Sequence, residues 1–457
     1  MAAMAPGAYA QEALRDSVDV TEIMQVEEWS LRKCTEYAIS HNREIIHQIL
    51  QSKMQEADLA LARKARIPSL TGGVQEIFHF GNTLVAFSVD ANAIMSLTQL
   101  GAQFELPLFT GMQIPNHRKA MEWGLQASEQ NIEVARVNVR IKVAAAYLQL
   151  LMCKSEVQLA KEQVSMGEKL LSRAKKLVED GKKPKNEVSQ AEADLSGSRF
   201  LLTQAEGNEV MARVALANLL NLEDHNAFDI SAPDDPDYLP AQWKVDEIPF
   251  ESILQYHPSV RAAEYNVKSS EYRVKEAKSY YYPNLSMLAN YTTYFYAPFM
   301  LSGPAVNAGT NLPSGFDASQ FKTQLQNNGW GQVGFRLTIP ILSAFNVKEQ
   351  VKKARFAQQD ALTYLDETKL ELGKQIREAY YSTVTAKERH VSAVAAESAY
   401  KTSMDYRQEL YDVGRATLYD LSQDRLKWLK AQEEVLSAKY EYLLRSAILD
   451  IYIDFAE

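Results

Sequence analysis

Four segments of the chain alternate apolar and polar residues with a period of two, which is the pattern of a β-strand with one apolar face. They lie near residues 70–80, 95–108, 284–296 and 328–341. In the last segment, apolar residues alternate with polar or small ones: Val333, Phe335, Leu337 and Ile339 against Gln332, Gly334, Arg336 and Thr338. A helical pattern follows the second and the fourth segment. We therefore expect four strands, two of which lead directly into helices.

The helical patterns that follow are unusually long. Between residues 112 and 179 there is almost no Gly or Pro after Pro115, which predicts one nearly continuous helix. Within it, large apolar residues recur every seven positions, each of the first four with a small residue three positions later: Leu150, Val157, Val164, Leu171 and Val178, with Cys153, Ala160, Gly167 and Ala174. The next helix repeats the arrangement with Val188, Leu195 and Leu202 as large residues and Ala191, Ser198, Ala205 and Ala212 as small ones. Such heptads predict coiled-coil packing with a close approach of the helices.

The chain contains an internal duplication. Over much of its length the two copies are related by a shift of 233 residues, which pairs Pro107 with Pro340 and Gly181 with Gly414. The two glycines lie between long helical patterns and predict the tips of helical hairpins. The two prolines are expected at the junctions between strand and helix, because proline lacks the N–H group that a strand ladder needs.

These repeats divide the chain. We expect a first repeat over residues 21–222, an irregular linker rich in Asp and Pro over 223–248, and a second repeat over 249–457. Each repeat would contain a helix, a strand, a loop, a strand and two long helices. The second repeat has an extra stretch between its strands, near residues 301–321, whose Gly, Pro and Asn residues predict a long loop. Residues 1–20 are interpreted as the remnant of an export signal.

Composition and charge exclude some classes of protein. The chain has 457 residues, of which 46% are hydrophobic and 23% charged, so it is not expected to be disordered. A net charge of −9 without a basic cluster argues against a nucleic-acid partner. Cys34 and Cys153 suit neither a disulfide framework nor a zinc site. No apolar run approaches the roughly 18 residues of a membrane-spanning helix.

The sequence offers no constellation for catalysis. Its seven histidines include no pair spaced by four residues and no accompanying cluster of Cys or carboxylates at ligand spacing. It also lacks a phosphate-binding loop, a dinucleotide fingerprint and a nucleophile elbow. We therefore predict that the protein is not an enzyme, with no catalytic residues, no cofactor and no metal.

The strands allow two interpretations. Alternating strands of about ten residues with aromatic residues near their ends are typical of outer-membrane barrels, although a small soluble sheet packed on helices has the same alternation. In lipid, however, every backbone donor and acceptor must be paired, and about eight strands form the smallest well-filled barrel. Four strands cannot close. If they lie in a membrane, several chains must each contribute four strands to one barrel.

Five stretches follow one another along the chain: "EYAISHNREI", "ARIPSL", "FELPLFTG", "AAAYLQLL" and "YDVGRATLYDLSQDRLKWLKAQEEVLSAKYEYL". In this order, they resemble the outer-membrane efflux channels of the TolC family. The resemblance implies a mainly α fold with a β-barrel portion: a homotrimer in which a twelve-stranded barrel in the outer-membrane lipid continues into an α-helical barrel in the periplasm. It also implies that the partners are a periplasmic adaptor protein and an inner-membrane pump.

The resemblance also implies a gate at the hairpin tips. Asp420 matches an acid of the family's constriction at the periplasmic entrance, while Glu187 and Tyr411 match residues that hold the tip closed. Two further matches are displaced by one position, because the family's second acid falls beside Asp424 and its arginine beside Arg415. Threefold symmetry would make each Asp420 part of a ring of three like charges, which should bind cations and resist closure unless tied to partners such as Arg415 or Lys185. The alternative is that these are solvated hairpin charges and a carboxylate at a helix N-terminus.

From these features we expect an outer-membrane exit duct that carries small molecules passively from a pump and its adaptor to the exterior. Two other readings remain open at this point. The same fold could serve as a type I duct for protein secretion, and the long heptads alone would also suit a soluble coiled-coil scaffold.

Overall fold

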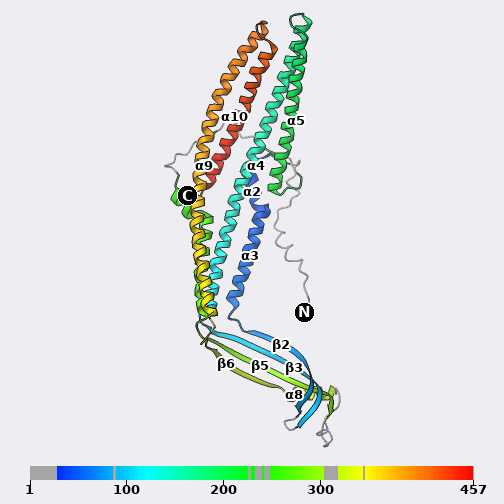
Figure 1. Cartoon of the computed structure of the whole chain (residues 1–457), viewed down its shortest axis with the longest axis vertical. Coiled ribbons are helices and arrows are strands. Elements are labelled where there is room, and N and C mark those ends of the chain that lie inside the picture. The colour runs from blue at the N-terminus through cyan, green and yellow to red at the C-terminus, as the bar shows by residue number, and fades with distance from the viewer. Residues whose placement is uncertain are drawn as a thin grey trace. The chain divides into compact units, whose positions relative to one another are not determined.

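A computed structural model describes residues 28–85, 89–224, 228–231, 239–240, 248–302, 318–342 and 345–455. The expected signal remnant at residues 1–20 lies outside this range. The chain divides into two compact units, one comprising Met1–Ser52, Ala127–Ala263 and Leu365–Glu457, the other Lys53–Gln126 and Glu264–Tyr364. We call them the hairpin unit and the sheet unit. The order of elements in the first half of the chain recurs in the second, which has an additional helix between its two strands (Figure 1).

The first half contains β1 (Glu28–Trp29), α2 (Leu31–His41), α3 (Arg43–Lys64), β2 (Ser69–Val85), β3 (Val89–Thr110), α4 (Gln113–Glu179) and α5 (Asn186–Leu220). The second half contains β4 (Asp229–Ile230), α6 (Phe250–Tyr256), α7 (Pro258–Ser279), β5 (Asn284–Ser302), α8 (Ala318–Asn327), β6 (Trp330–Thr338), α9 (Asn346–Asp412) and α10 (Leu418–Ile453). The predicted continuous helix over 112–179 is confirmed by α4. None of the helices described carries a stretch long and apolar enough to cross a membrane.

The long helices of the hairpin unit pack through the small residues of the heptads. On α4 the residues Cys153, Ala160 and Ala174 are buried, as are Ala191 and Ala205 on α5. At Gly167 of α4, an added Cβ would lie 3.2 Å from Leu195 Cδ1 of α5. The pairing of large with small residues therefore allows the close approach of these two helices, as the heptads predict.

The main core of the hairpin unit joins α2, α4 and α5. It contains Trp29, Val143, Leu150 and Leu216, and it also takes in Phe228 and Ile230 from the segment between the repeats. Residues Asp229–Ile230 form β4, which pairs in parallel with β1. The prediction that the whole linker is irregular is therefore wrong at this point. Burial of Phe228 and Ile230 supplies a physical reason for the short pairing.

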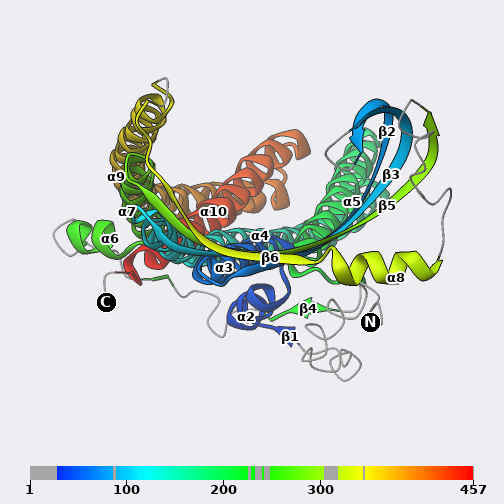
Figure 2. The same cartoon turned by 90° about the horizontal axis from the view of Figure 1, so that it is seen from below.

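In the sheet unit, the four long strands form one sheet in the order β2-β3-β5-β6, with every neighbouring pair antiparallel. Figure 2 shows them as a curved band. The first three strands are longer than predicted, with 17, 22 and 19 residues, whereas β6 has only 9. Within the predicted loop near 301–321, residues 301–302 end β5 and residues 318–321 belong to α8, while residues 303–317 lie outside the described range.

The two faces of the sheet differ in polarity. Directly paired residues lie on the same face, so the registers define one row of polar side chains across all four strands: Thr71, Gln103, Asn290 and Gln332. The opposite face carries apolar residues: Leu70, Val74, Phe104, Leu106, Met287, Ala289, Val333, Phe335 and Leu337. We call these the polar face and the apolar face. Leu70, Val333 and Phe335 are exposed to 74%, 68% and 71%.

The junctions between strand and helix differ from the prediction in one repeat. Pro107 does not close its strand, because β3 continues to Thr110 and pairs with β5 on both sides of a register shift at Pro107. The chain instead turns at Gly111 and Met112, which have φ of 59° and 69°. Pro340 lies two residues beyond the end of β6, in the connection to α9. There the ladder does end before the proline.

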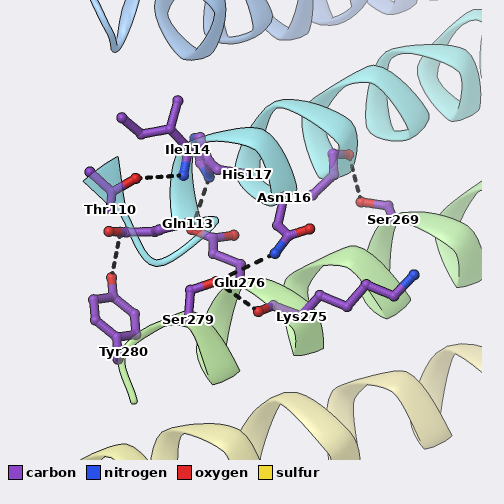
Figure 3. A network of polar contacts seen from close by, with 11 residues as sticks. Thr110, Gln113, Ile114, Asn116, His117, Ser269, Lys275, Glu276, Ser279 and Tyr280 are labelled. Carbon is purple, nitrogen blue, oxygen red and sulfur yellow. Dashed lines mark hydrogen bonds and ion pairs between the residues drawn. The ribbon is translucent and has the colours of Figure 1, made fainter. Parts of the chain in front are cut away.

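A polar network fixes the first turns of α4 against the end of α7 within the sheet unit (Figure 3). Gln113 Nε2 donates to Tyr280 Oη at 2.9 Å, and His117 Nδ1 lies 3.0 Å from Glu276 Oε1. At Gly111 an added Cβ would lie 2.7 Å from the carbonyl oxygen of Ser279. The glycine thus permits both the left-handed backbone and the close approach to α7.

Candidate functional site at the hairpin tips

The hairpin unit ends in two helical turns of the same design. Gly181 follows α4 with φ of 72°, and Gly414 follows α9 with φ of 78°. The N–H groups of Gly181 and Lys182 donate to the carbonyls of Val178 and Leu177, and those of Gly414 and Arg415 donate to Tyr411 and Leu410. This is the left-handed glycine ending that satisfies the last carbonyls of a helix. The predicted tips therefore correspond to real turns.

A small apolar cluster joins the two hairpins at their tips. Its buried members come from both: Ala174 and Ala191 from α4 and α5, with Tyr411, Ala416, Leu418 and Leu421 from the hairpin of α9 and α10. Because Tyr411 is only 2% exposed, its hydroxyl needs a hydrogen-bond partner within the protein.

Glu187 of α5 supplies that partner. The Tyr411 hydroxyl donates to Glu187 Oε2 at 2.9 Å, and Lys183 Nζ lies 3.4 Å from Glu187 Oε1. Lys183 also donates to the carbonyl of Ala416 at 3.2 Å, and its ammonium lies 4.7 Å from the centre of the Tyr411 ring. Burial and the hydrogen bond to the Glu187 carboxylate raise the pKa of Tyr411. We call Lys183, Glu187 and Tyr411 the latch, because they connect the two hairpins.

Asp424 is buried inside the hairpin of α9 and α10, where it pairs with two more exposed cations. Its Oδ2 accepts a hydrogen bond from Arg407 Nε at 2.9 Å, and its Oδ1 accepts one from Lys427 Nζ at 3.2 Å. The hydrogen bond from Arg407 is the main cause that lowers the pKa of Asp424, and Lys427 adds to it. Arg407 lies 17 residues before Asp424, so this contact fixes α9 to α10.

Asp420 caps the start of α10. It accepts the backbone N–H of Thr417 at 3.2 Å and the Thr417 hydroxyl at 2.7 Å, while its own N–H donates to Thr417 Oγ1, which completes a capping box at the start of α10. The hydrogen bond from the Thr417 side chain is the main cause of its lowered pKa. Among the described residues, neither Arg415 nor Lys185 contacts its side chain. Within its own chain, the Asp420 carboxylate is therefore held by the cap.

Several contacts between the two hairpins were not predicted from the sequence. Ser422 Oγ donates to Asp194 Oδ2 at 2.6 Å, and Arg173 Nη2 lies 2.7 Å from Asp412 Oδ1. The buried guanidinium of Arg425 donates from Nη2 to the carbonyl of Gln163 at 2.9 Å. The heptad gives a partial signal for Arg425, since it lies four residues after the heptad residue Leu421. In the described part of the chain, no group of three His, Cys, Asp or Glu could hold a metal ion.

A family model for outer membrane efflux proteins matches residues 35–222 and 250–452 of this chain. The chain belongs to the outer membrane efflux protein family. The resemblance to TolC-family channels is thereby confirmed, and the protein is an efflux channel of the outer membrane. Its family and fold are those of channels, not of enzymes, and the alternative of a soluble coiled-coil scaffold is set aside.

Individual members of the family resemble the chain along most of its length. It is 21% identical to the outer membrane efflux protein BepC of Brucella suis over 87% of this chain and 79% of BepC. The CmeC outer membrane channel of Campylobacter jejuni superposes with a TM-score of 0.74 and 19% identity, covering 93% of this chain and 86% of CmeC. For VceC of Vibrio cholerae the TM-score is 0.73 and the identity 16%, covering 93% and 95%. At these identities, the likeness shows that the fold is shared, and it assigns no role to individual residues of the tips.

Proposed function

We propose that this efflux channel is a homotrimer and the passive exit duct of a tripartite system, which receives small molecules from an inner-membrane pump and its periplasmic adaptor. The observation that carries the proposal is the four-stranded sheet. Within the described residues, β2 and β6 each pair with a neighbour on one side only. An unpaired backbone group in lipid costs several kcal/mol, so the two edges need partners from other chains.

Strand direction supports closure by identical copies. The four strands alternate in direction, so β6 of one copy would run antiparallel to β2 of the next. Three copies would then close twelve strands with the same antiparallel pairing throughout, well above the minimum for a filled barrel. The apolar face would contact lipid, and the polar face with Gln103, Asn290 and Gln332 would line a water-filled lumen.

At the other end of the long helices, we assign the tips to the gate. The latch of Lys183, Glu187 and Tyr411 would hold the two hairpins of each copy together. Threefold symmetry would place three Asp420 carboxylates around one axis, which would attract cations into a narrow entrance. Arg415, whose side chain is exposed, would meet groups outside its own chain, such as a neighbouring copy or the adaptor.

Planar-bilayer recording of the purified full-length protein tests the duct and its constriction together. Wild-type protein should give discrete conductance steps that divalent cations reduce. Asp420→Asn should weaken the cation block and the preference for cations, because it removes the charge and keeps a capping oxygen. Glu409→Gln is a matched control, since Glu409 is exposed on α9 near the same tip. Absence of channels would contradict the duct, and an unchanged cation block in Asp420→Asn would contradict the constriction.

A further inference from the structure

The two edge strands of the sheet have different lengths. β2 has 17 residues, whereas β6 has 9 and pairs with β5 only as far as Thr292. If the ends next to the helices are aligned, with Ser69 beside Thr338, β6 of one copy reaches only Ile77 in β2 of the next. The outer edge of residues 78–85 of β2, which pair with β3 on their other edge, would then have no strand partner. On the apolar face of this stretch, Phe78 and Phe80 are exposed to 54% and 75%.

α8 lies beside β5 at the height where β6 no longer pairs with that strand. The chain passes from α8 directly into β6, and Figure 2 shows α8 continuing from the end of that strand. Three contacts attach it to β5 beyond the last β6 pair. Thr293 Oγ1 donates to the carbonyl of Leu325 at 2.6 Å, and the rings of Phe295 and Phe321 meet edge to face with centres 4.9 Å apart.

The third contact is a hydrogen bond from a side chain next to α8 to the backbone at the open edge of β5. Asn328 Nδ2, just after α8, donates to the backbone carbonyl of Tyr294 at 2.9 Å. A side-chain amide thereby satisfies a carbonyl of β5 where β6 no longer reaches it. Towards β5 the helix presents the apolar Phe321 and Leu325, and its exposed side carries further polar groups: Lys322, Gln326 and Asn327.

We propose that α8 fills the seam between β5 of its own chain and β2 of the next copy over residues 78–85. Its exposed amides supply hydrogen bonds to the open edge of that β2, as Asn328 does for β5, and its body covers Phe78 and Phe80. The occupant of this surface is therefore a second copy of the same chain. The inference rests on the proposed trimer and explains how a barrel with one short strand per copy closes along its full height.

Crosslinking with a short bismaleimide tests the seam in the full-length protein extracted from the outer membrane. Phe80→Cys combined with Gln326→Cys should give linked dimers and trimers on a denaturing gel. Val74→Cys with Val333→Cys is the reference pair, because it tests the β6–β2 contact alone. The wild type, whose Cys34 and Cys153 are buried, and the single variants should give no links.

The two pairs separate failure of this inference from failure of the trimer. Links for Val74 with Val333 but none for Phe80 with Gln326 would overturn the seam position of α8 and leave the trimer intact. Links for neither pair would overturn both. Full labelling of Gln326→Cys by a bulky maleimide in the assembled trimer would show that α8 faces lipid or solvent, which also contradicts the inference.

Discussion

Tyr411 connects the two hairpins through a hydrogen bond that lies almost entirely out of water. Its hydroxyl is held by the Glu187 carboxylate, and Lys183 balances the charge of that carboxylate. A buried carboxylate is costly unless it is paired and hydrogen-bonded, so each member of the latch depends on the other two. The latch thus favours one arrangement of the tips.

Removing the latch hydrogen bond should open the channel more easily. A hydrogen bond to a charged group contributes about 1.5–3 kcal/mol, so Tyr411→Phe and Glu187→Gln should each raise the conductance or the fraction of time open in planar bilayers. Tyr406→Phe is the matched control, because Tyr406 is exposed at 63% on the same helix. Equal conductance for all three variants and the wild type would contradict the role of the latch.

Asp424 makes the hairpin of α9 and α10 sensitive to acid. Its pKa is lowered by Arg407, so its contribution to stability is present above the ordinary carboxyl pKa of about 3.9 and is lost as the pH falls through the lower, folded value. After correction for the intrinsic exchange rate at each pH, the protection of amide hydrogens at the α9–α10 tip should therefore fall in strong acid in the wild type. Asp424→Asn should exchange faster already at neutral pH and lose part of the acid dependence.

Asp405→Asn provides the control for this acid dependence, because Asp405 is exposed on α9. It should behave as the wild type at every pH. If Asp424→Asn also exchanges as the wild type does at neutral pH, the ion pair with Arg407 does not hold the hairpin.

The sequence predicts single residues of the site better than their partners. Glu187 and Tyr411 do meet, 224 residues apart, because Glu187 lies six residues after Gly181, Tyr411 lies three before Gly414, and the two tips pack against each other. Arg415 is near Asp420 in sequence but does not pair with it. The Asp420 carboxylate instead accepts hydrogen bonds from Thr417, which caps the start of the helix. Arg407 and Asp424 pair across a hairpin, and no local sequence pattern predicts that contact.

The contact between Lys183 and Glu187, by contrast, could have been predicted, because residues four apart are neighbours on a helical turn.

Among the helices, the close packing of α4 against α5 should depend on Gly167. Gly167→Leu should destabilise the hairpin by about 1–3 kcal/mol, because the new side chain meets Leu195. Gly207→Leu on α5 has nothing within 4 Å of the added Cβ, and it should be neutral or stabilising by up to about 1 kcal/mol. Thermal unfolding followed by helical circular dichroism compares the two variants. Equal unfolding temperatures would contradict the close packing at Gly167.

Elements with a long regular period were the most predictable. The near absence of Gly and Pro predicts the length of α4, the heptads from Leu150 onwards predict its packing, and alternation identifies all four long strands. Pro107 was misplaced because a proline can sit within a strand at an irregular pairing, as it does at the register shift with β5. α8 was missed because the Gly, Pro and Asn residues of its surroundings indicate a loop, and its few apolar residues gain their burial only from β5.

For the protein in its membrane, we infer that one chain is incomplete without identical copies. Its sheet has two unpaired edges among the described strands, an exposed apolar face and a polar face of amides. These features become compatible with a membrane when identical copies pair β6 with β2. The duplication allows this closure, because two hairpins of strands per chain give an even number of strands and therefore antiparallel neighbours at every seam.

The most direct test is the mass of the full-length protein, extracted from the outer membrane in mild detergent and measured by native mass spectrometry or light scattering with the detergent subtracted. The account predicts one assembly of three times the chain mass, which resists dilution because separation would expose the strand edges. A folded monomer that remains stable in the same detergent, with strands and helices intact, would contradict it.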